Sequence, residues 1–403
     1  MKAEQFQAGA PGRLVPTVGG AQAFVPAALP SPVDLDTPTV RLLARAENAL
    51  GRLAGTTARE VNPYLVGSPM LHRDAILSSR MEGTITTPEQ LVLVQAGAET
   101  GKPVPRDDDT QEVLNYMNAM IRGLERMKEI PICLRLIREV HAELMTGVRG
   151  DRERPGEFRT DQNWIGTKAD DSIGAARFVP PPVPEMTTAL AELETYLNRE
   201  PSDENDPVLI RLALIHYQFE TIHPFRDGNG RVGRLLIPLL LCSYGRLESP
   251  VLYLSAFFEK NRERYVDLLL YVSQTGDWKP WIDFFLHGVL ESAEEGTQQA
   301  SDLLALRLSY HRKFQTGRSS ALLIRLVDRL FQTPSITISA AAKLLDVTPQ
   351  AASNNINKLV DAGILKEVTG KRRGQVFIAN EIMSFMYDRP ESSDDPVTGR
   401  GDS

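Results

Sequence analysis

Apolar residues, mainly leucine and alanine, recur three and four positions apart along most of the chain, and this spacing predicts helices. The predicted helices span residues 37–62, 67–82, 86–97, 108–128, 131–150, 184–198, 207–221, 231–245, 255–275 and 279–293. The pattern changes in residues 151–182, where QNWIG and ARFVP are two β-prone runs separated by a polar loop. Such a pair predicts a β-hairpin over 163–180. We therefore expect a mainly α-helical protein that carries one small hairpin.

A separate unit is predicted at residues 336–386. SAAAKLLD, the turn VTP and QAASNNINKLVDAG follow a helix-turn-helix pattern, and ILKEVTGKRRGQVFIA adds a strand pair with a basic turn. This order predicts a winged helix-turn-helix unit. The other predicted segments are an irregular Gly- and Pro-rich arm at 1–35, an N-terminal helical region at 36–105, a helical core at 106–295, a helical linker at 296–335 and a disordered polar tail at 387–403.

Composition restricts the class of protein. The 403 residues are 42% hydrophobic and carry a net charge of −7, so no general attraction to nucleic acid or to anionic membranes is expected. The two cysteines both have apolar neighbours, which favours two buried free thiols in a reducing cytoplasm. Apolar runs stay well below the roughly 18 residues of a membrane span. We expect a cytoplasmic protein with no membrane partner.

The predicted winged unit differs from the rest of the chain in charge. Basic residues outnumber acidic ones by three in residues 336–380, and Lys366, Lys371, Arg372 and Arg373 all fall in the predicted wing. A basic wing suits DNA phosphates, but winged helices also bind proteins. Contact with DNA and contact with a protein therefore both stay open.

The segment HPFRDGNGRVGR (223–234) places small and polar residues directly before the apolar run LLIPLLLC. His223 ends a predicted apolar helix, and the glycines of DGNG let backbone N–H groups approach an anion closely. The helix that begins near Arg231 adds its N-terminal N–H groups and the positive end of its dipole. The segment therefore predicts a polyphosphate site supported by a buried helix.

Most polar side chains of this segment suit one task at a polyphosphate. Asp227 is the natural ligand for Mg²⁺, Asn229 can orient one phosphoryl group, and Arg231 with Arg234 can neutralise the others. His223 can take a proton from an incoming hydroxyl, so in-line attack on phosphorus is predicted. A P-loop is disfavoured because GxxxxGK[ST] does not occur. One histidine and one aspartate are too few for a zinc or two-metal hydrolase.

These residues resemble the signature of the Fic family, His-x-Phe-x-Asp/Glu-Gly-Asn-Gly-Arg-x-x-Arg, without a departure. The likeness covers roughly residues 37–290, and a C-terminal winged helix is also seen in this family. The segments that carry it outside the signature are LLARAENALGRLAG, AILSSRMEGT, PGEFRTDQNWIG with ARFVPPP, and LSAFFEKNRERYVDLLLYV with GDWKPWIDFFL. The resemblance implies a Fic-type helical bundle with a β-hairpin flap.

The resemblance also implies an activity, the transfer of AMP from ATP to a Ser, Thr or Tyr hydroxyl of a protein, the chain itself included. The implied roles are the general base for His223, the Mg²⁺ ligand for Asp227, the α-phosphate contact for Asn229, and the β- and γ-phosphate contacts for Gly228, Gly230, Arg231 and Arg234. The hairpin at 163–180 corresponds to the flap that aligns the target by main-chain pairing.

Tyr265 falls near the adenine pocket of the family. An ordinary core aromatic on an amphipathic helix is an equally good interpretation of this residue. Val266 follows it where relatives often carry a second tyrosine, which is a departure from the family pattern.

The segment SSRMEG (78–83) matches the inhibitory pattern of the family, Ser/Thr-x-x-x-Glu-Gly/Asn. Ser78 and Glu82 are four residues apart and share one helix face. By resemblance, the Glu82 carboxylate docks on Arg234 and occupies the arginine that the γ-phosphate of ATP needs. The expected result is an autoinhibited enzyme.

Two alternatives remain open at this point. In the first, the chain is a DNA-binding regulator whose Fic core senses nucleotide. In the second, the fold is kept but the enzyme uses a different donor or removes AMP. The sequence leaves the target protein unnamed, and a monomer and a homodimer are both compatible with it.

Overall fold

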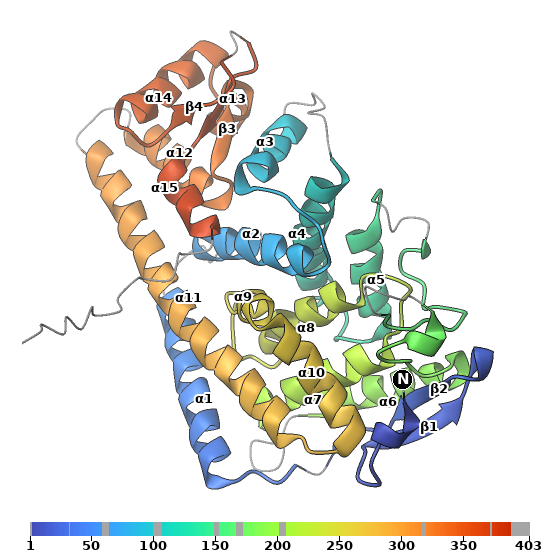
Figure 1. Ribbon diagram of the computed structural model, residues 1–403. Coiled ribbons are helices and arrows are strands. Elements are labelled where there is room, and N and C mark those ends of the chain that lie inside the picture. The colour runs from blue at the N-terminus through green and yellow to red at the C-terminus, as the bar shows by residue number, and fades with distance from the viewer. Residues whose placement is uncertain are drawn as a thin grey trace, which may run out of the picture.

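The computed structural model describes residues 2–31, 33–58, 64–99, 107–148, 153–166, 172–200, 207–315, 320–370 and 373–387. Helices make up most of this part of the chain, so the predicted mainly α-helical class is confirmed (Figure 1). The helices are α1 (Thr37–Thr57), α2 (Tyr64–Met81), α3 (Pro88–Glu99), α4 (Asp108–Arg126), α5 (Leu134–Met145), α6 (Val183–Leu197), α7 (Val208–Ile222), α8 (Asn229–Ser243), α9 (Ser255–Lys260), α10 (Arg262–Thr275), α11 (Lys279–Phe314), α12 (Ser320–Gln332), α13 (Ile338–Leu345), α14 (Pro349–Asp361) and α15 (Asn380–Met383).

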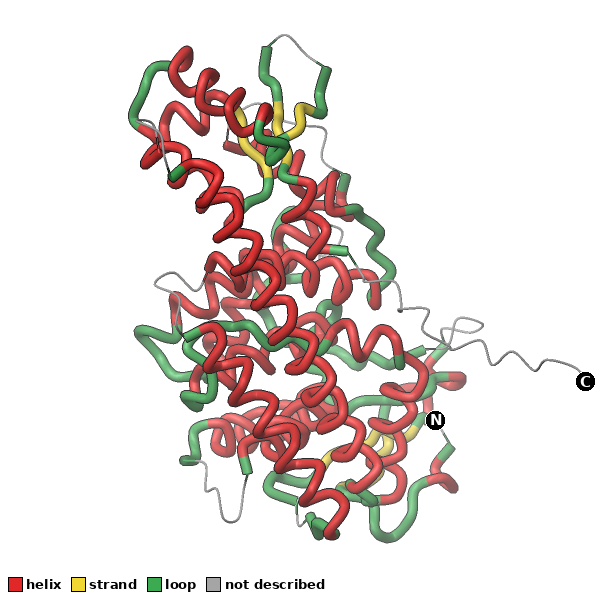
Figure 2. The backbone as a smooth tube through the Cα atoms, turned by 90° about the vertical axis from the view of Figure 1, so that its left-hand side faces the viewer, coloured by secondary structure: helices red, strands yellow, loops and turns green. Residues whose placement is uncertain are grey.

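Strands occur in two places within the described residues, one near the N-terminus and one in the C-terminal unit (Figure 2). The strands are β1 (Gly12–Pro16), β2 (Gln22–Pro26), β3 (Ser335–Thr337), β4 (Lys366–Glu367) and β5 (Val376–Ile378). Short 3₁₀ turns complete the elements, η1 (Ala3–Gln5), η2 (Val18–Gly20), η4 (Ile173–Ala175) and η5 (Ser384–Met386).

Helix α7 is buried on nearly every side, because its sequence is apolar around the whole helix rather than on one stripe. Helix α8 follows it after a short loop and is almost as completely buried. The loop between α7 and α8 is the 223–228 part of the polar segment. Two buried helices therefore support the predicted phosphate site from behind.

The predicted irregular arm at residues 1–35 is wrong in its central part. β1 and β2 form an antiparallel pair in which Leu14 lies opposite Phe24. Gly19 and Gly20 adopt positive φ angles of 67° and 75° and reverse the chain. Glycine, proline and alanine are abundant here and hide the short apolar alternation that forms the strands. Val15 and other apolar residues of the hairpin pack in a small cluster with Val179.

The predicted helical linker at 296–335 is also wrong in its boundary. Helix α11 runs without a break from Lys279 to Phe314, so one 36-residue helix connects the core with the C-terminal unit. Its first half packs along α1, as Figure 1 shows for the medium blue helix α1 and the orange helix α11. Helix α12 then turns back and packs on α2.

The predicted hairpin at 163–180 is much smaller than expected. One antiparallel bridge joins Ile165 to Phe178, and no strand flanks it in the residues described on either side. Residues 167–171, at the centre of this prediction, lie outside the described residues. The two arms are nevertheless paired, because the Ile165 N–H donates to the Phe178 carbonyl at 2.8 Å.

The C-terminal unit has the predicted order of two helices followed by a strand pair. β3, β5 and β4 form a three-stranded sheet in that spatial order. Asn355 of α14 is buried and donates to the Ala351 carbonyl at 2.9 Å. Lys371, Arg372 and the predicted tail from 388 onward lie outside the described residues.

The unit is not detached from the core. The Ser335 hydroxyl donates to the Val92 carbonyl of α3 at 3.1 Å, and η5 packs on α2. A single contiguous apolar cluster extends from α1 to the last described residues.

Cys133 and Cys242 are free thiols, but both are partly exposed rather than buried. None of the helices in the described part of the chain is long and apolar enough to cross a membrane.

Candidate active site

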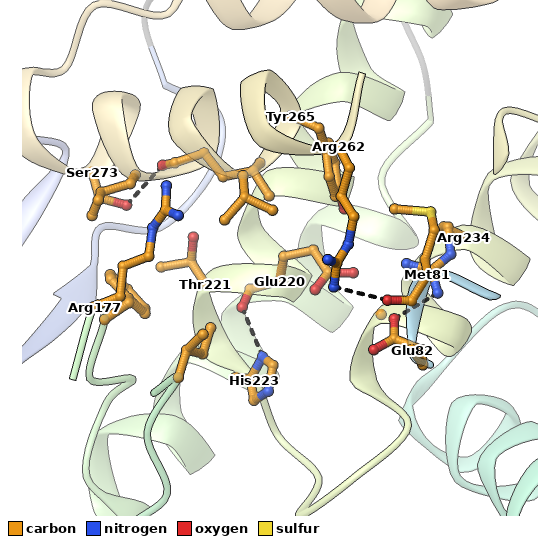
Figure 3. Close-up of a pocket in the computed structure, with 16 residues that line it drawn as sticks. Met81, Glu82, Arg177, Glu220, Thr221, His223, Arg234, Arg262, Tyr265 and Ser273 are labelled. Atoms are coloured by element: carbon orange, nitrogen blue, oxygen red, sulfur yellow. Dashed lines mark hydrogen bonds and ion pairs between the residues drawn. The ribbon is translucent and has the colours of Figure 1, made fainter. Parts of the chain in front are cut away.

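His223 leaves the packed helix α7 through a left-handed turn. Its φ and ψ angles are 48° and 61°, while its N–H still donates to the Phe219 carbonyl at 3.0 Å. A positive φ is uncommon for a residue other than glycine, and such outliers gather at functional sites. The turn directs the imidazole out of the core and into the cavity shown in Figure 3.

The protonation state of His223 follows from its surroundings. Nδ1 lies 3.3 Å from the Glu220 carbonyl, which only accepts hydrogen bonds, so Nδ1 carries the hydrogen and Nε2 keeps its lone pair. Burial lowers the pKa of His223 to about 4, and the charge of Arg159 acts in the same direction. His223 is therefore neutral at pH 7 and can accept a proton.

The conformation of the loop between α7 and α8 is held by side-chain contacts from Asn229 and from His141 of α5. The Asn229 Oδ1 accepts from the Phe225 N–H and its Nδ2 donates to the Phe225 carbonyl, both at 2.8 Å. The ring of His141 stacks on Phe225 with 3.7 Å between centroids. His141 Nδ1 accepts from the Gly156 N–H, so Nε2 carries the hydrogen and donates to the Asp227 carbonyl at 3.0 Å. These contacts fix the loop in one conformation.

The N-terminus of α8 faces the same cavity. Gly228 precedes the helix with a φ of 79°, and a Cβ there would lie 2.9 Å from the sulfur of Met145. Gly230, in the first turn, leaves room for an anion, because a Cβ there would lie 2.5 Å from the Glu82 Oε1. A carboxylate of the chain thus already sits over the helix N-terminus, where a phosphate would be stabilised.

Glu82 reaches this position from the end of α2 and pairs with Arg234. The Glu82 Oε1 and Arg234 Nη2 are 2.7 Å apart. Arg234 Nε also donates to the Ser78 hydroxyl at 2.8 Å, and Nη2 donates to the Ser78 carbonyl at 3.0 Å. Burial, the largest single influence, would raise the pKa of Glu82, but the charge and hydrogen bond of Arg234, together with the charges of Arg231 and Arg262, outweigh it, and the pKa lies below its usual value. The structure therefore brings Ser78, Glu82 and Arg234 together as an ionised cluster.

Arg231 does not line the cavity. Its guanidinium is 1% exposed and lies 3.1 Å from the carboxylate of Glu112, a fully buried residue of α4. A second, longer ion pair of 3.5 Å links it to Asp227. The sequence predicts phosphate contacts for Arg231, whereas in the structure its charge is compensated by Glu112 beneath the loop.

Asp227 meets the requirements of a Mg²⁺ ligand. Its side chain is 44% exposed, and its Oδ1 accepts from the Gly228 N–H at 2.6 Å. No group of three or more His, Cys, Asp or Glu side chains able to hold a metal occurs in the described residues. Mg²⁺ commonly uses one or two carboxylates together with substrate phosphates and waters. The residues therefore fit a Mg²⁺ ion that arrives with a polyphosphate.

The cavity itself has a volume of about 190 Å³ and extends away from this cluster. In Figure 3, Arg234 and Glu82 lie at one end, Arg177 and Ser273 lie at the other, and His223 faces the cavity from below. Tyr265 also lines it, although its hydroxyl is held by His216 Nε2 at 2.8 Å. The predicted Tyr265 is thus at once a core aromatic and part of the cavity wall.

Several residues of the site were missed by sequence analysis. Buried Arg159 donates from Nε to the His223 carbonyl at 3.0 Å, and Asn163 Nδ2 donates to the Phe225 carbonyl at 3.0 Å. Arg262 donates to the Met81 carbonyl at 2.9 Å and so holds the end of α2. Arg159 and Asn163 lie in the segment PGEFRTDQNWIG, which as a whole resembles the family. No local sequence pattern marks either residue.

The two chain segments around Ile165 and Phe178, called the flap arms below, are attached to two other elements. The Phe24 N–H of β2 donates to the Val179 carbonyl at 2.9 Å, and the Thr17 hydroxyl donates to Gln162 at 2.8 Å. On the other side, Arg177 forms an ion pair with Asp267 of α10. The N-terminal hairpin and α10 therefore hold the flap arms beside the cavity.

Comparison with protein families agrees with this geometry. Residues 131–241 match the Fic/DOC family, and residues 40–125 match the Fic/DOC family N-terminal region. A protein adenylyltransferase Fic of Culex quinquefasciatus is 32% identical over 171 residues, which cover 42% of this chain and 29% of that protein. A protein adenylyltransferase Fic of Drosophila grimshawi is 30% identical over 212 residues, which cover 51% of this chain and 38% of that protein. The chain thus spans well under half of these curated relatives.

Among solved structures, a Fic family protein from Desulfovibrio desulfuricans has the same fold. The TM-score is 0.53 at 20% sequence identity, and the alignment covers 87% of this chain and 98% of that one.

Proposed function

Because the chain carries a Fic/DOC domain and the N-terminal region of the same family, we propose that it transfers AMP from ATP to a hydroxyl group of a protein, itself included. The observation that carries the proposal is the position of a neutral histidine beside a helix N-terminus. His223 keeps a free lone pair on Nε2, and the first turn of α8 already holds an anion in the form of the Glu82 carboxylate. An acceptor for a proton and a site for phosphates therefore share one cavity.

In the proposed reaction, the phosphates of ATP replace the Glu82 carboxylate over Gly230 and at Arg234. Nε2 of His223 takes the proton of the target hydroxyl while the hydroxyl oxygen bonds to the α-phosphorus. The bond from that phosphorus to the bridging oxygen breaks, and pyrophosphate leaves. A Mg²⁺ ion, held by Asp227, would neutralise charge on the phosphates.

The remaining polar residues of the loop position these groups. The Asn229 side chain closes the loop through Phe225, and Arg231 holds Asp227 in place from below. Arg159 fixes the His223 backbone through its carbonyl. We assign the flap arms around Ile165 to the target, whose main chain would pair with them.

We further propose that Glu82 restrains this activity. Its carboxylate occupies both the guanidinium of Arg234 and the space over Gly230. Phosphates of ATP need both positions, so productive binding requires Glu82 to leave. The side chain of Glu82 is 36% exposed, which leaves it a route out of the cavity.

Mass spectrometry of the full chain after incubation with ATP and Mg²⁺ tests both proposals. Glu82→Gly is expected to raise self-modification by AMP, because it frees Arg234 and the space over Gly230. Adding His223→Ala to that variant is expected to reduce the modification at least about 100-fold, the usual contribution of a general base. His287→Ala, which removes an exposed histidine of α11, is the matched control and is expected to change nothing.

Two results would contradict these proposals in different ways. Equal modification of the wild type and Glu82→Gly would contradict the proposed restraint by Glu82. Full modification in the presence of His223→Ala would contradict the proposed role of His223 as the base, while the proposed donor and reaction would stand.

A further inference from the structure

Glu220 carries a carboxylate that the reaction described above does not use. It lies on α7, one turn before His223, and it lines the same cavity. Its Oε1 is buried and has no hydrogen-bond partner in the described residues. A buried acceptor without a partner is costly, so a hydrogen-bond donor that the chain itself does not supply is expected there.

The packing of α7 against α8 holds this carboxylate in place. A Cβ at Gly233 would lie 2.2 Å from the Glu220 Oε1 and 3.3 Å from the ring of Phe219. Any side chain at Gly233 would therefore push the carboxylate away. The glycine at this position leaves a space that the Glu220 carboxylate fills.

The position of Glu220 within the cavity indicates which part of a ligand it meets. Gly230 and Arg234 form the phosphate end, and the opposite end is formed mostly by apolar residues of α10 and the flap arms. Figure 3 shows Glu220 between the Arg234–Glu82 cluster and the Arg177–Ser273 end. A nucleotide with its phosphates at Arg234 and its base at the apolar end would place its sugar beside Glu220.

The chemistry of the nucleotide narrows the contact further. Ionised phosphates carry no hydrogen-bond donors, whereas the ribose carries two hydroxyl groups that donate. Burial raises the pKa of Glu220 to about 7 against the opposing charge of Arg234, and Glu82 adds to the increase. Near neutral pH the carboxyl group is therefore only partly ionised, which limits its repulsion of a nearby phosphate.

We propose that Glu220 is a specificity-determining residue that accepts a hydrogen bond from a ribose hydroxyl of the bound nucleotide. This inference rests on the proposed function, because it takes a nucleoside triphosphate as the ligand. Glu220 then selects ribonucleotides over deoxyribonucleotides, since a nucleotide without the hydroxyl leaves the carboxylate unpaired. A site built around such a hydrogen bond rejects analogues that lack it.

Calorimetric titration of the full chain tests this selection. The protein carries Glu82→Gly to open the phosphate end and His223→Ala to prevent turnover, and the ligands are ATP, 2′-deoxy-ATP and 3′-deoxy-ATP with Mg²⁺. At least one deoxynucleotide is expected to bind about 10-fold more weakly than ATP, because loss of the donor leaves a buried acceptor without a hydrogen bond. Replacing Glu220 by Met is expected to weaken ATP binding and to make the three nucleotides bind alike.

Glu220→Gln is the matched control, because it keeps an acceptor oxygen of the same reach and is expected to keep part of the preference. ATP and its deoxy analogues are also compared in the protein that keeps Glu220. This comparison remains valid even if Glu220→Met fails to fold. Equal affinity for all three nucleotides there would overturn the inference. An unchanged preference in Glu220→Met would overturn it as well.

AMP transfer by the Glu82→Gly chain, measured in parallel, separates this inference from the proposed function. Transfer from ATP together with no preference for the hydroxyl would overturn only the role of Glu220. Failure of the chain to bind ATP at all would overturn both.

Discussion

Two arginines three residues apart on α8 are paired with glutamates in different ways. The Arg231–Glu112 pair is closed off from solvent, with side-chain exposures of 1% and 0%. In the Arg234–Glu82 pair, the arginine is 3% exposed but the glutamate is 36% exposed. Glu112 belongs to the interior of α4, whereas Glu82 directly follows the last residue of α2. The first pair is a permanent part of the loop support, and under the proposed function the second is exchanged for the phosphates of ATP.

The largest effect is expected from breaking the permanent pair. Glu112→Ala leaves the buried guanidinium of Arg231 without its main counter-charge and also removes the partner of the Thr84 hydroxyl. We expect the free energy of unfolding to fall by about 3–5 kcal/mol. Urea denaturation followed by circular dichroism measures this change.

Glu125→Ala is the control for that experiment, because Glu125 is an exposed residue of the same helix. A surface substitution of this kind is expected to change the free energy of unfolding by less than about 0.5 kcal/mol. Similar values for the two variants would show that the buried pair contributes no more than a surface charge.

A smaller effect is expected from Glu220, whose titration makes the free energy of unfolding depend on pH. Burial raises the pKa of Glu220 to about 7 from the usual 4.5, so the folded protein keeps a proton there that the unfolded chain releases. The stabilisation from this proton is complete below about pH 4.5 and is lost as the pH rises through about 7. The total loss is about 3 kcal/mol.

Comparison of the wild type with Glu220→Gln, which cannot titrate, isolates this contribution. The stability of the wild type relative to the variant should decline between pH 5 and pH 8, whereas exposed Glu263→Gln should follow the wild type throughout. A constant difference between the wild type and Glu220→Gln across this range would contradict the raised pKa. Thermal melts in a series of buffers provide the measurement.

The smallest change in stability is expected from the exchangeable pair. Glu82→Gln removes a partly exposed charge, while Arg234 keeps its bonds to the hydroxyl and carbonyl of Ser78. We expect a loss of about 1 kcal/mol in the free energy of unfolding, together with a rise in self-modification by AMP. A loss as large as that of Glu112→Ala would show that the two pairs are equally built into the fold.

The sequence predicted some of these features and not others for identifiable physical reasons. The loop from His223 to Arg234 is contiguous, so local rules for helix ends, glycines and anions were enough to locate it. The Glu82–Arg234 contact joins residues far apart in the chain and was expected only through the family resemblance. Glu112 and Arg159 carry no such signal, because their role depends on which helix packs beside them.

The hairpin β1–β2 was missed for a different reason. Its glycines and prolines are typical of irregular chain, and its apolar residues become meaningful only against the flap arms they cover. The Gly233–Glu220 packing is a similar case. A glycine inside an apolar helix looks like a minor cost in helix propensity until the neighbouring carboxylate is seen.

Helix α2 connects two distant parts of the molecule. Its 18 residues correspond to a length of about 27 Å. α12 and η5 of the C-terminal unit pack on this helix, and the residue that follows its last turn is Glu82. Apart from Pro69 near its start, α2 is a continuous helix, so a shift of α2 at one end is passed along to the other. Under the proposed function, any ligand of the C-terminal unit that displaces α2 is linked to ATP, and each must change the affinity for the other by the same factor.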